Sequence, residues 1–377
     1  MNKKKLYLAA LPVLFVLPML FIQSLPAFGQ ASFGNLAADS DAKKEKTKDK
    51  KSGKSESPEV TEEDSGESAD AKKAEVSKWA EPQLGTARNL KFRYGMRFEA
   101  RPGGECTNVF GTIPVPINWP EQKVRVIEED IPNGVRVEYR DLREGGCREM
   151  VLKMACLKAG QKVEASVMLE IVRSEQAPPT DVTELKIPKR VPKELKQYLR
   201  ESPFIEINNR KIRKRAKEIA AEIDSDWEKV NAVFREVRET VKYKEAYVEK
   251  EVRGALGALE SGEGDCEDMS CLMIAYLRNL DIPARTVRVP DHCWAEFYLE
   301  DAQGTGHWYP AQVAGNEALG VSSSAQAMQP ILQKGDAFSL PESPRETTRY
   351  VKEIFAGEVE KNGPNPKYEF IQEEIRR

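Results

Sequence analysis

The sequence predicts an α+β protein in which an all-β domain precedes a core that packs helices on an antiparallel sheet. Short β-rich runs separated by turn residues extend from Leu84 to Arg173, which is typical of a β-sandwich. Further along the chain, apolar residues recur at helical spacing from Met269 to Leu280. From Trp294 to Leu299 apolar and polar residues alternate, which indicates a half-buried strand. Strands followed by a mixture of helices and strands therefore predict two domains of different class.

The amino terminus has the pattern of an export signal over residues 1–30. Residues 3–5 are lysines, an apolar run follows from Leu6 to Ile22, and cleavage after Gly29 or Ala31 fits the small residues there. The run is short for a membrane span and contains two prolines, so an uncleaved membrane anchor is the alternative. We expect the folded body to be exported, to the periplasm or outside the cell, where disulfides can persist. It would contact a membrane only if this segment stays uncleaved.

Residues 31–80 are dominated by lysine, glutamate, aspartate and serine. Such a segment cannot bury enough apolar surface to offset its conformational entropy, so we expect a disordered linker between the export segment and the folded body. Its charges are mixed in sign, and the whole chain has a formal net charge of −3. This near-neutral balance argues against a nucleic-acid partner.

The predicted β-sandwich-like domain covers residues 81–175. Its expected strands are Leu90–Phe98, Val124–Ile127, Val135–Tyr139, Glu149–Met154 and Val163–Ile171. We expect this domain to support the core or to restrict access to its groove, with a carbohydrate- or protein-binding role as the alternative. A proline-rich linker over residues 176–200 leads to the core at residues 201–360, and residues 361–377 are expected to be a weakly ordered tail.

Two amphipathic helices are expected at the start of the core. The segment Ile212 to Ile223 places apolar residues on one face, and the basic run Arg210 to Lys217 is then its solvated side. Phosphate or membrane binding by that run is the alternative. Ser225 and Glu228 form a capping-box pattern that opens the second helix, which buries apolar residues from Trp227 to Val241.

Cys266 stands where the next helix should begin. Gly262 and Gly264 favour a turn immediately before it. Asp281-Ile282-Pro283 ends the helix, because proline disfavours helical geometry at the preceding residue. The unpaired N–H groups and the positive dipole end of a first helical turn favour a thiolate, and the same groups can stabilise an oxyanion. The position therefore predicts a nucleophilic thiol.

His292 is the expected base for this thiol. The chain contains two histidines, His292 and His307. Pro290-Asp291 interrupts a β-rich run just before His292, so the imidazole should lie at the start of a strand. A cysteine on a helix with a histidine on the adjoining sheet is the arrangement that thiol-catalysed acyl transfer requires.

Three motifs in this region resemble the transglutaminase-like superfamily. They are Gly-x-Cys-x-Asp at residues 264–268, Arg-x-Leu-x-Ile-Pro-Ala-Arg at residues 278–285 and His-x-Trp-x-Glu at residues 292–296. The resemblance covers Ser225 to Gln312, about a quarter of the chain, and the motifs are specific in combination. It implies a papain-like core and a substrate that presents a peptide bond or a glutamine carboxamide.

By this resemblance Cys266 would be the nucleophile and His292 the base. The third member in the family is an aspartate four residues after a tryptophan on the next strand, and counting from Trp308 leads to Gln312. A glutamine can accept a hydrogen bond from the imidazole N–H and fix its tautomer, although it adds no negative charge. We expect a weakened or differently tuned site, with a non-catalytic interaction module as the alternative.

Two aromatic residues are further candidates at the site. The resemblance places Tyr243 near the oxyanion hole, with Tyr247 as the second choice and a simple core role for Tyr243 as the alternative. Trp294 alternates onto the same strand face as His292, so it either supports the sheet or walls the groove. The small, polar segment Gly315 to Gln329 is expected to be a surface loop near the groove mouth.

The chain has six cysteines, Cys106, Cys147, Cys156, Cys266, Cys271 and Cys293. One bridge is expected among the first three, whereas Cys271 and Cys293 are expected to be small buried residues. Complete pairing into three disulfides is the alternative, and it would make Cys266 structural. A metal site around Cys266 is disfavoured because the thiols and His292 lack zinc-ligand spacing. No EF-hand-like loop is present in the sequence, and no cofactor is expected.

The sequence thus predicts an exported enzyme that forms a thioester on Cys266 with a protein or peptide substrate. The thioester would be resolved by water, which gives hydrolysis, or by an amine, which gives cross-linking. Both outcomes remain open, because the choice depends on how the groove excludes water and presents an amine.

Overall fold

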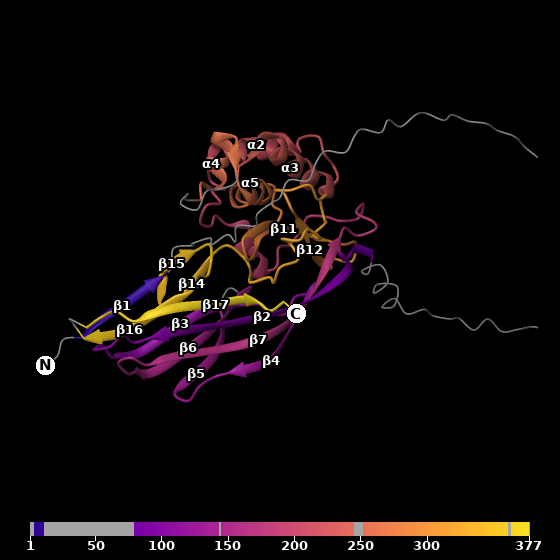
Figure 1. The fold of residues 1–377 in the computed structure, drawn as a ribbon. Coiled ribbons are helices and arrows are strands. Elements are labelled where there is room, and N and C mark those ends of the chain that lie inside the picture. The colour runs from indigo at the N-terminus through magenta and orange to yellow at the C-terminus, as the bar shows by residue number, and fades with distance from the viewer. Residues whose placement is uncertain (1–3, 11–78, 143–144, 245–251, 361–362, 377) are drawn as a thin grey trace, which may run out of the picture. The chain divides into compact units, whose positions relative to one another are not determined.

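A computed structural model describes residues 4–10, 79–142, 145–244, 252–360 and 363–376 (Figure 1). Most of the predicted export signal and nearly all of the predicted linker lie outside these residues, so both stay predictions. The first described segment is strand β1 (Lys4–Ala10). No helix in the described ranges is long and apolar enough to cross a membrane.

Two antiparallel sheets form a β-sandwich. The five-stranded sheet has the order β1, β16 (Ile354–Glu360), β3 (Cys106–Val115), β6 (Arg148–Leu157), β5 (Val135–Asp141). The four-stranded sheet has the order β17 (Lys367–Glu374), β2 (Gln83–Glu99), β7 (Lys162–Ala177), β4 (Gln122–Asp130). Inward-facing side chains of both sheets share one core, in which Tyr94, Met96 and Ile113 are fully buried. The predicted all-β domain is confirmed.

Two parts of the sandwich differ from the sequence prediction. Strand β3 has no predicted counterpart, because Gly111 and Pro114 interrupt its β-rich pattern. The carboxy-terminal residues, expected to be a weakly ordered tail, form β17, which pairs with β2 along its whole length. Tyr368 stacks on Phe355 with ring centroids 4.7 Å apart, which fixes this strand on the sandwich. The sandwich is built from both ends of the chain, so the core ends before β16, earlier than predicted.

In its described part the core has four α-helices and one 3-10 helix. They are η1 (Lys193–Leu199), α2 (Arg210–Ala220), α3 (Asp226–Thr240), α4 (Gly254–Ser261) and α5 (Cys266–Arg278). The side chains of Asn209 and Ser225 cap α2 and α3 by accepting from the backbone N–H groups of Lys211 and Glu228. The other three α-helices lie around α5 (Figure 1), and every residue of α5 from Asp268 to Arg278 is buried.

Helix α5 packs on a four-stranded antiparallel sheet. The strand order is β12 (Gly306–Ala311), β11 (His292–Glu300), β10 (Ala284–Val289), β13 (Gln333–Lys334). Along β11, Ala295, Phe297 and Leu299 pack with residues of α5, whereas Trp294 belongs to a separate apolar cluster with Val287. Two small pairs complete the core, β8 (Lys242–Tyr243) with β9 (Glu263–Gly264) and β14 (Phe338–Leu340) with β15 (Ser343–Thr348). The predicted α+β core is confirmed.

The sandwich and the core belong to one compact unit and contact each other along residues 322–336. The Lys334 ammonium group, which is buried, lies 2.6 Å from a carboxylate oxygen of Glu121 and 2.6 Å from one of Glu296. The side-chain oxygen of Gln122 accepts from the Ile331 N–H at 2.7 Å. A buried ion pair that loses one partner is strongly destabilised. These contacts therefore keep residues 322–336 against the sandwich.

Candidate active site

Local hydrogen bonds fix Cys266 as the first residue of α5. The Asp265 carboxylate caps the helix by accepting from the backbone N–H groups of Glu267 at 2.9 Å and Asp268 at 3.1 Å. Gly264 lies so close to Asp268 that a Cβ added to it would be 2.7 Å from the Asp268 Cβ. The glycine and the aspartate before the cysteine therefore set the position of the thiol.

Asp268 stabilises the start of a second helix. Its buried carboxylate accepts from the backbone N–H groups of Arg253 at 2.8 Å and Gly254 at 3.0 Å, and it lies 3.3 Å from Arg253 Nε. These bonds join the start of α4 to the first turn of α5. The final aspartate of the Gly-x-Cys-x-Asp motif is thus a structural residue that supports the helix bearing the thiol.

A tight hairpin places His292 at the start of β11. Strands β10 and β11 pair from Val289 and His292 onward, so Pro290 and Asp291 form the turn. Asp291 has a φ of 58°, the left-handed conformation that the second turn position requires. His292 Nε2 lies 2.9 Å from Gln312 Oε1. Because an amide oxygen only accepts, Nε2 carries the proton in this arrangement, and Nδ1 keeps its lone pair.

Gln312 follows β12 directly and is buried, with 2% of its surface exposed. Its Nε2 lies 3.3 Å from Ser322 Oγ and donates to it, so the other end of the amide is the one that meets His292. Ser322 is completely buried, whereas the sequence predicts a surface loop for its segment. No motif or periodicity singles it out, because its environment depends on the sandwich strand that covers it.

The electrostatic environment keeps the imidazole neutral. Burial lowers the pKa of His292 below its ordinary value, while the hydrogen bond to Gln312 and the negative charge of Glu317 act in the opposite direction. A neutral imidazole with a free Nδ1 lone pair is the form that can accept a proton. The second histidine, His307, is buried beside Asp301, with Nε2 3.5 Å from Oδ2, and has no contact with this arrangement.

The Cys266 thiol is hydrogen-bonded to the thiol of Cys293. That bond raises the pKa of Cys266 well above its ordinary value, and burial and the charge of Asp265 add to the rise. Within the described residues no hydrogen bond joins Cys266 to His292. The first helical turn does not lower the pKa of Cys266 as expected, because Cys293 and burial raise it more strongly. Asp265 adds to the rise, since it occupies two of the N–H groups of the turn and carries a negative charge. The resting thiol is neutral.

The two aromatic candidates lie in different environments. Trp294 is completely buried, and its ring centroid lies 6.0 Å from that of His292, so it supports the imidazole from the interior and lines no open groove. Tyr243 is 54% exposed and pairs with Gly264 between β8 and β9, so it is not a core aromatic. Tyr247, the second choice, lies outside the described residues.

The described cysteines of the sandwich and of the core form no disulfide. Cys106 and Cys147 are thiols, so the predicted bridge in the sandwich is not formed. Cys106 and Cys156 lie on the paired strands β3 and β6. Cys106 pairs with Leu157, so the side chain of Cys156, the residue before Leu157, points to the other face of the sheet. In the core, Cys266, Cys271 and Cys293 are also thiols. Across the described ranges no group of three histidine, cysteine, aspartate or glutamate side chains is placed to hold a metal ion.

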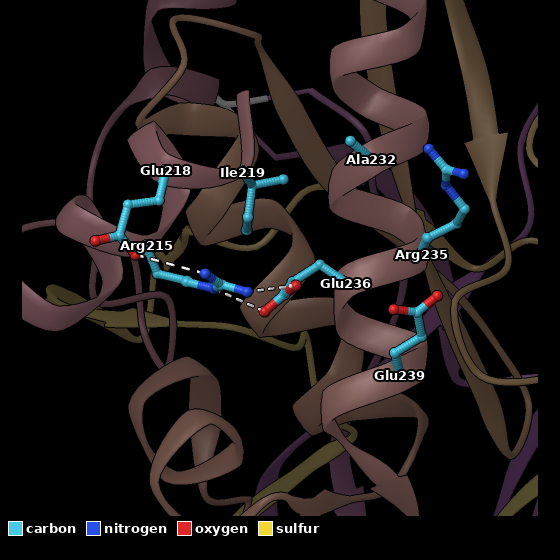
Figure 2. A pocket seen from close by; sticks show the side chains of 7 residues that line it. All are labelled: Arg215, Glu218, Ile219, Ala232, Arg235, Glu236 and Glu239. Atoms are coloured by element: carbon cyan, nitrogen blue, oxygen red, sulfur yellow. Dashed lines mark hydrogen bonds and ion pairs between the residues drawn. The ribbon is translucent and has the colours of Figure 1, made fainter. Parts of the chain in front are cut away.

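A separate surface hollow lies between α2 and α3 and has a volume of about 310 Å³ (Figure 2). In Figure 2 the Arg215 guanidinium reaches across to Glu236, with two nitrogen–oxygen distances of 2.8 Å. Residues Arg215, Glu218, Ile219, Ala232, Arg235, Glu236 and Glu239 line it. It contains none of the candidate catalytic residues, and its ion pairs agree with a solvated basic face on α2.

One family model matches part of the core, and two solved structures are similar to larger parts of the chain. Residues 213–313 match the family model described as the transglutaminase-like superfamily. A solved structure from Cytophaga hutchinsonii, described as a "putative cysteine protease", is 16% identical and has a TM-score of 0.49, with 78% of this chain and 94% of that chain covered. A structure from Parabacteroides distasonis, described as a "putative protease", is 14% identical with a TM-score of 0.25, and the match covers 60% of this chain and 44% of that one. No curated protein matches the chain.

The fold and the arrangement of residues define a papain-like class, in which a cysteine begins a buried helix and a histidine begins a strand of the sheet below it. Within that class, residues 213–313 are similar to the core domain of the transglutaminase-like superfamily. The matched range contains Cys266, His292 and Gln312, and the β-sandwich lies outside it.

Proposed function

We propose that the protein is an exported thiol acyltransferase that acts on protein or peptide substrates. In this proposal Cys266 is the nucleophile, His292 is the general base and acid, and Gln312 orients the imidazole. The proposal rests above all on the 2.9 Å contact between His292 Nε2 and Gln312 Oε1. Because of this contact, Nδ1 of His292 is free to accept a proton. His292 is the residue next to Cys293, which is the hydrogen-bond partner of the Cys266 thiol.

The reaction starts from a neutral thiol and a neutral imidazole. The Cys266 thiol turns from Cys293 toward His292, and Nδ1 accepts its proton as the sulfur attacks the substrate carbonyl carbon. Collapse of the tetrahedral intermediate breaks the carbon–nitrogen bond, and the amine leaves with the proton from His292. The thioester that remains on Cys266 is attacked by water or by a second amine, which releases the acyl group and restores the thiol.

The oxyanion of the tetrahedral intermediate needs hydrogen-bond donors. The N–H groups of Glu267 and Asp268 already donate to Asp265, so the N–H of Cys266 itself is the first-turn donor assigned to this role. Tyr243 is the second candidate, because β8 pairs it with Gly264, two residues before the nucleophile, and its ring is exposed.

p-Nitrophenyl acetate tests the proposal without knowledge of the natural substrate. We expect the full chain to release nitrophenolate and to carry one acetyl group on Cys266, located by mass spectrometry of its peptide. His292→Ala should slow this acetylation by about a hundredfold or more, and Cys271→Ala, which changes a buried thiol of the same helix, should not. Acetylation that is equally fast without His292 would exclude the enzyme. With cadaverine added, the ratio of acetate to acetylcadaverine distinguishes hydrolysis from cross-linking.

A non-catalytic interaction module is the second candidate function. Two observations favour it, the uncharged Gln312 in place of an aspartate and the Cys266 thiol bonded to Cys293 with its pKa raised. This candidate predicts no acetylation of Cys266 above the rate at the other thiols of the chain. The p-nitrophenyl acetate experiment therefore separates the two functions.

A further inference from the structure

We propose that Cys293 is a second reactive thiol, which forms a disulfide with Cys266 by exchange with a low-molecular-weight disulfide and so switches the active site off reversibly. An exported chain meets such disulfides, because compartments outside the cytosol are oxidising. The effect on activity rests on the proposed function, in which Cys266 is the nucleophile. The disulfide itself is a chemical property of the thiol pair and does not depend on catalysis.

The two thiols belong to elements that meet at the candidate site. Cys266 begins α5, and Cys293 is the second residue of β11. The sulfur of Cys266 is hydrogen-bonded to the Cys293 thiol and also accepts from the backbone N–H of Cys293. A disulfide requires two sulfur atoms to approach to about 2 Å, and a pair already in hydrogen-bond contact starts from a short separation. The contact therefore places a partner for disulfide formation beside the nucleophile.

The thiols of the core differ in their access to solvent. Cys266 is partly exposed, whereas Cys293 is 2% exposed and lies on a strand that pairs in register with β10. A disulfide from solution therefore reacts first at Cys266, and Cys293 is the internal thiol that displaces the small group. Cys271 is buried as well, but among the described residues no hydrogen bond joins it to Cys266.

A buried positive charge lies within electrostatic range of Cys293. Arg349 is 3% exposed, and its three side-chain nitrogens have no hydrogen-bond partner within the described residues. Burial lowers the pKa of Arg349, but negative charge on Cys271, Tyr350 and Cys293 raises it more strongly, so the guanidinium stays protonated. A buried charge without a partner is costly. In this position it compensates the negative charge that forms on the Cys293 sulfur as that sulfur attacks.

The reaction is a thiol–disulfide exchange in two steps. The Cys266 thiol loses its proton, its sulfur attacks one sulfur of the small disulfide, and the S–S bond breaks to release one small thiolate. The Cys293 thiol then loses its proton, its sulfur attacks the Cys266 sulfur of the mixed disulfide, and the second small thiolate leaves. The two thiolates take up the two protons, so the small disulfide is reduced to two thiols while the protein is oxidised to the internal disulfide.

The test incubates the full chain with oxidised glutathione at mildly alkaline pH, which offsets the raised pKa of Cys266. We expect a disulfide between Cys266 and Cys293, identified by mass spectrometry after cleavage behind Glu267, which separates Cys266 from Cys271. Acetylation of Cys266 by p-nitrophenyl acetate should fall by about a hundredfold or more, because the nucleophile is the thiolate. Dithiothreitol should restore the original rate.

Three positions separate the two steps of the exchange. In Cys293→Ala, Cys266 should keep glutathione as a mixed disulfide, because no second thiol displaces it. Arg349→Met removes the buried charge, so conversion of the mixed disulfide to the internal one should slow by about tenfold, whereas Arg349→Lys keeps the charge and should slow it less. Cys271→Ala is the matched control for removal of a buried thiol, and it should form the disulfide at an unchanged rate.

The outcomes are distinct. Unmodified thiols, glutathione that stays on Cys266 of the unchanged chain, or a bridge to Cys271 each overturn the role of Cys293. Equal conversion in Arg349→Met overturns the role of the guanidinium. A disulfide between Cys266 and Cys293 in a chain whose reduced form never acetylates Cys266 supports the thiol pair and overturns the proposed function, and acetylation without the disulfide does the reverse. If Cys293→Ala does not fold, Cys293→Ser keeps the size of the side chain and should retain the mixed disulfide in the same way.

Discussion

The histidine side and the cysteine side of the candidate site are prepared to different degrees. His292 is held by Gln312 at 2.9 Å, and Gln312 in turn by Ser322 at 3.3 Å, so the imidazole is oriented through two buried side chains. Cys266 is bonded to Cys293, and this bond raises its pKa well above the ordinary value. In the proposed mechanism the base is therefore in position before substrate binds, whereas the nucleophile has to change its hydrogen-bond partner to react.

The charge balance of the site explains why the resting pair is neutral. A negative charge near the imidazole stabilises a thiolate–imidazolium pair further. Gln312 supplies none, and burial lowers the pKa of His292 although Glu317 acts in the opposite direction. Burial and the adjoining Asp265 act against the thiolate as well. The neutral form of both groups is therefore favoured in the free protein.

The largest expected effect separates the two sides of the site. His292→Ala should lower the rate of Cys266 acetylation by p-nitrophenyl acetate about 10²- to 10⁴-fold, because it removes the general base. The rate of alkylation by iodoacetamide at the same thiol should change little, because no hydrogen bond joins the two residues in the described part of the chain. Both rates are measured by mass spectrometry of the Cys266 peptide. If alkylation falls as steeply as acetylation, the resting protein holds a thiolate–imidazolium pair between Cys266 and His292. The two sides of the site would then be equally prepared for the reaction.

A smaller effect is expected when the partner of the thiol is removed. Cys293→Ala deletes the hydrogen bond that contributes most to the raised pKa of Cys266, so the thiolate fraction at neutral pH should rise. We expect iodoacetamide alkylation of Cys266 to accelerate about tenfold, which corresponds to a fall of about one pKa unit. Cys271→Ala is the matched control, because it removes a buried thiol of α5 itself. Equal rates in all three proteins would show that Cys293 does not restrain the nucleophile.

A negative charge at position 312 should act on the histidine side. Gln312→Glu stabilises the imidazolium, so it should raise the pKa of His292, which burial holds below its ordinary value of 6.5. Acetylation requires the neutral imidazole, so the rate falls as pH drops through this pKa, and the fall should begin at higher pH in the variant. We expect the midpoint to rise by about one unit, measured from the pH dependence of p-nitrophenyl acetate turnover. A midpoint that stays in place would mean that the side chain at 312 does not sense the imidazole.

Local sequence patterns were sufficient to predict most of the helices and strands. The helical spacing after Cys266 and the capping pattern at Ser225 correspond to α5 and to the start of α3. The alternation along β11 also holds, with Phe297 packed against the helices and Trp294 in a separate cluster. Strand β17 was not predicted, although Tyr368 and Phe370 alternate with charged residues, because its partner β2 lies about three quarters of the chain length away in sequence. Local pattern does not reveal such a pairing.

The site was predictable to the extent that it depends on spacing. Counting from Trp308 led to Gln312, and the structure places its oxygen on His292. The contact between Cys266 and Cys293 was not predictable, because it depends on the rotamer of the thiol after the helix and the sheet have packed. Ser322 was not predictable either, since it becomes buried only when the end of β7 bridges to it. Contacts of this kind require the tertiary structure.

The smallest expected effect concerns the charge and the cap that Asp265 combines at the start of α5. Asp265→Asn keeps a side-chain oxygen that can accept from the Glu267 and Asp268 N–H groups, so stability should change little. It removes the negative charge that raises the pKa of Cys266, so alkylation by iodoacetamide at neutral pH should become about two- to threefold faster.

Asp265→Ala removes the charge and the cap together. Alkylation should accelerate as in Asp265→Asn, while the free energy of unfolding should fall by about 1 kcal/mol, measured by urea denaturation. If only Asp265→Ala accelerates alkylation, the released N–H groups, and not the lost charge, control the thiolate. The first helical turn would then favour the thiolate once it is uncapped, and the neutral resting thiol would be a consequence of capping by Asp265. In that case Asp265 would account for the neutral state of the cysteine side, whereas burial would account for that of the histidine side.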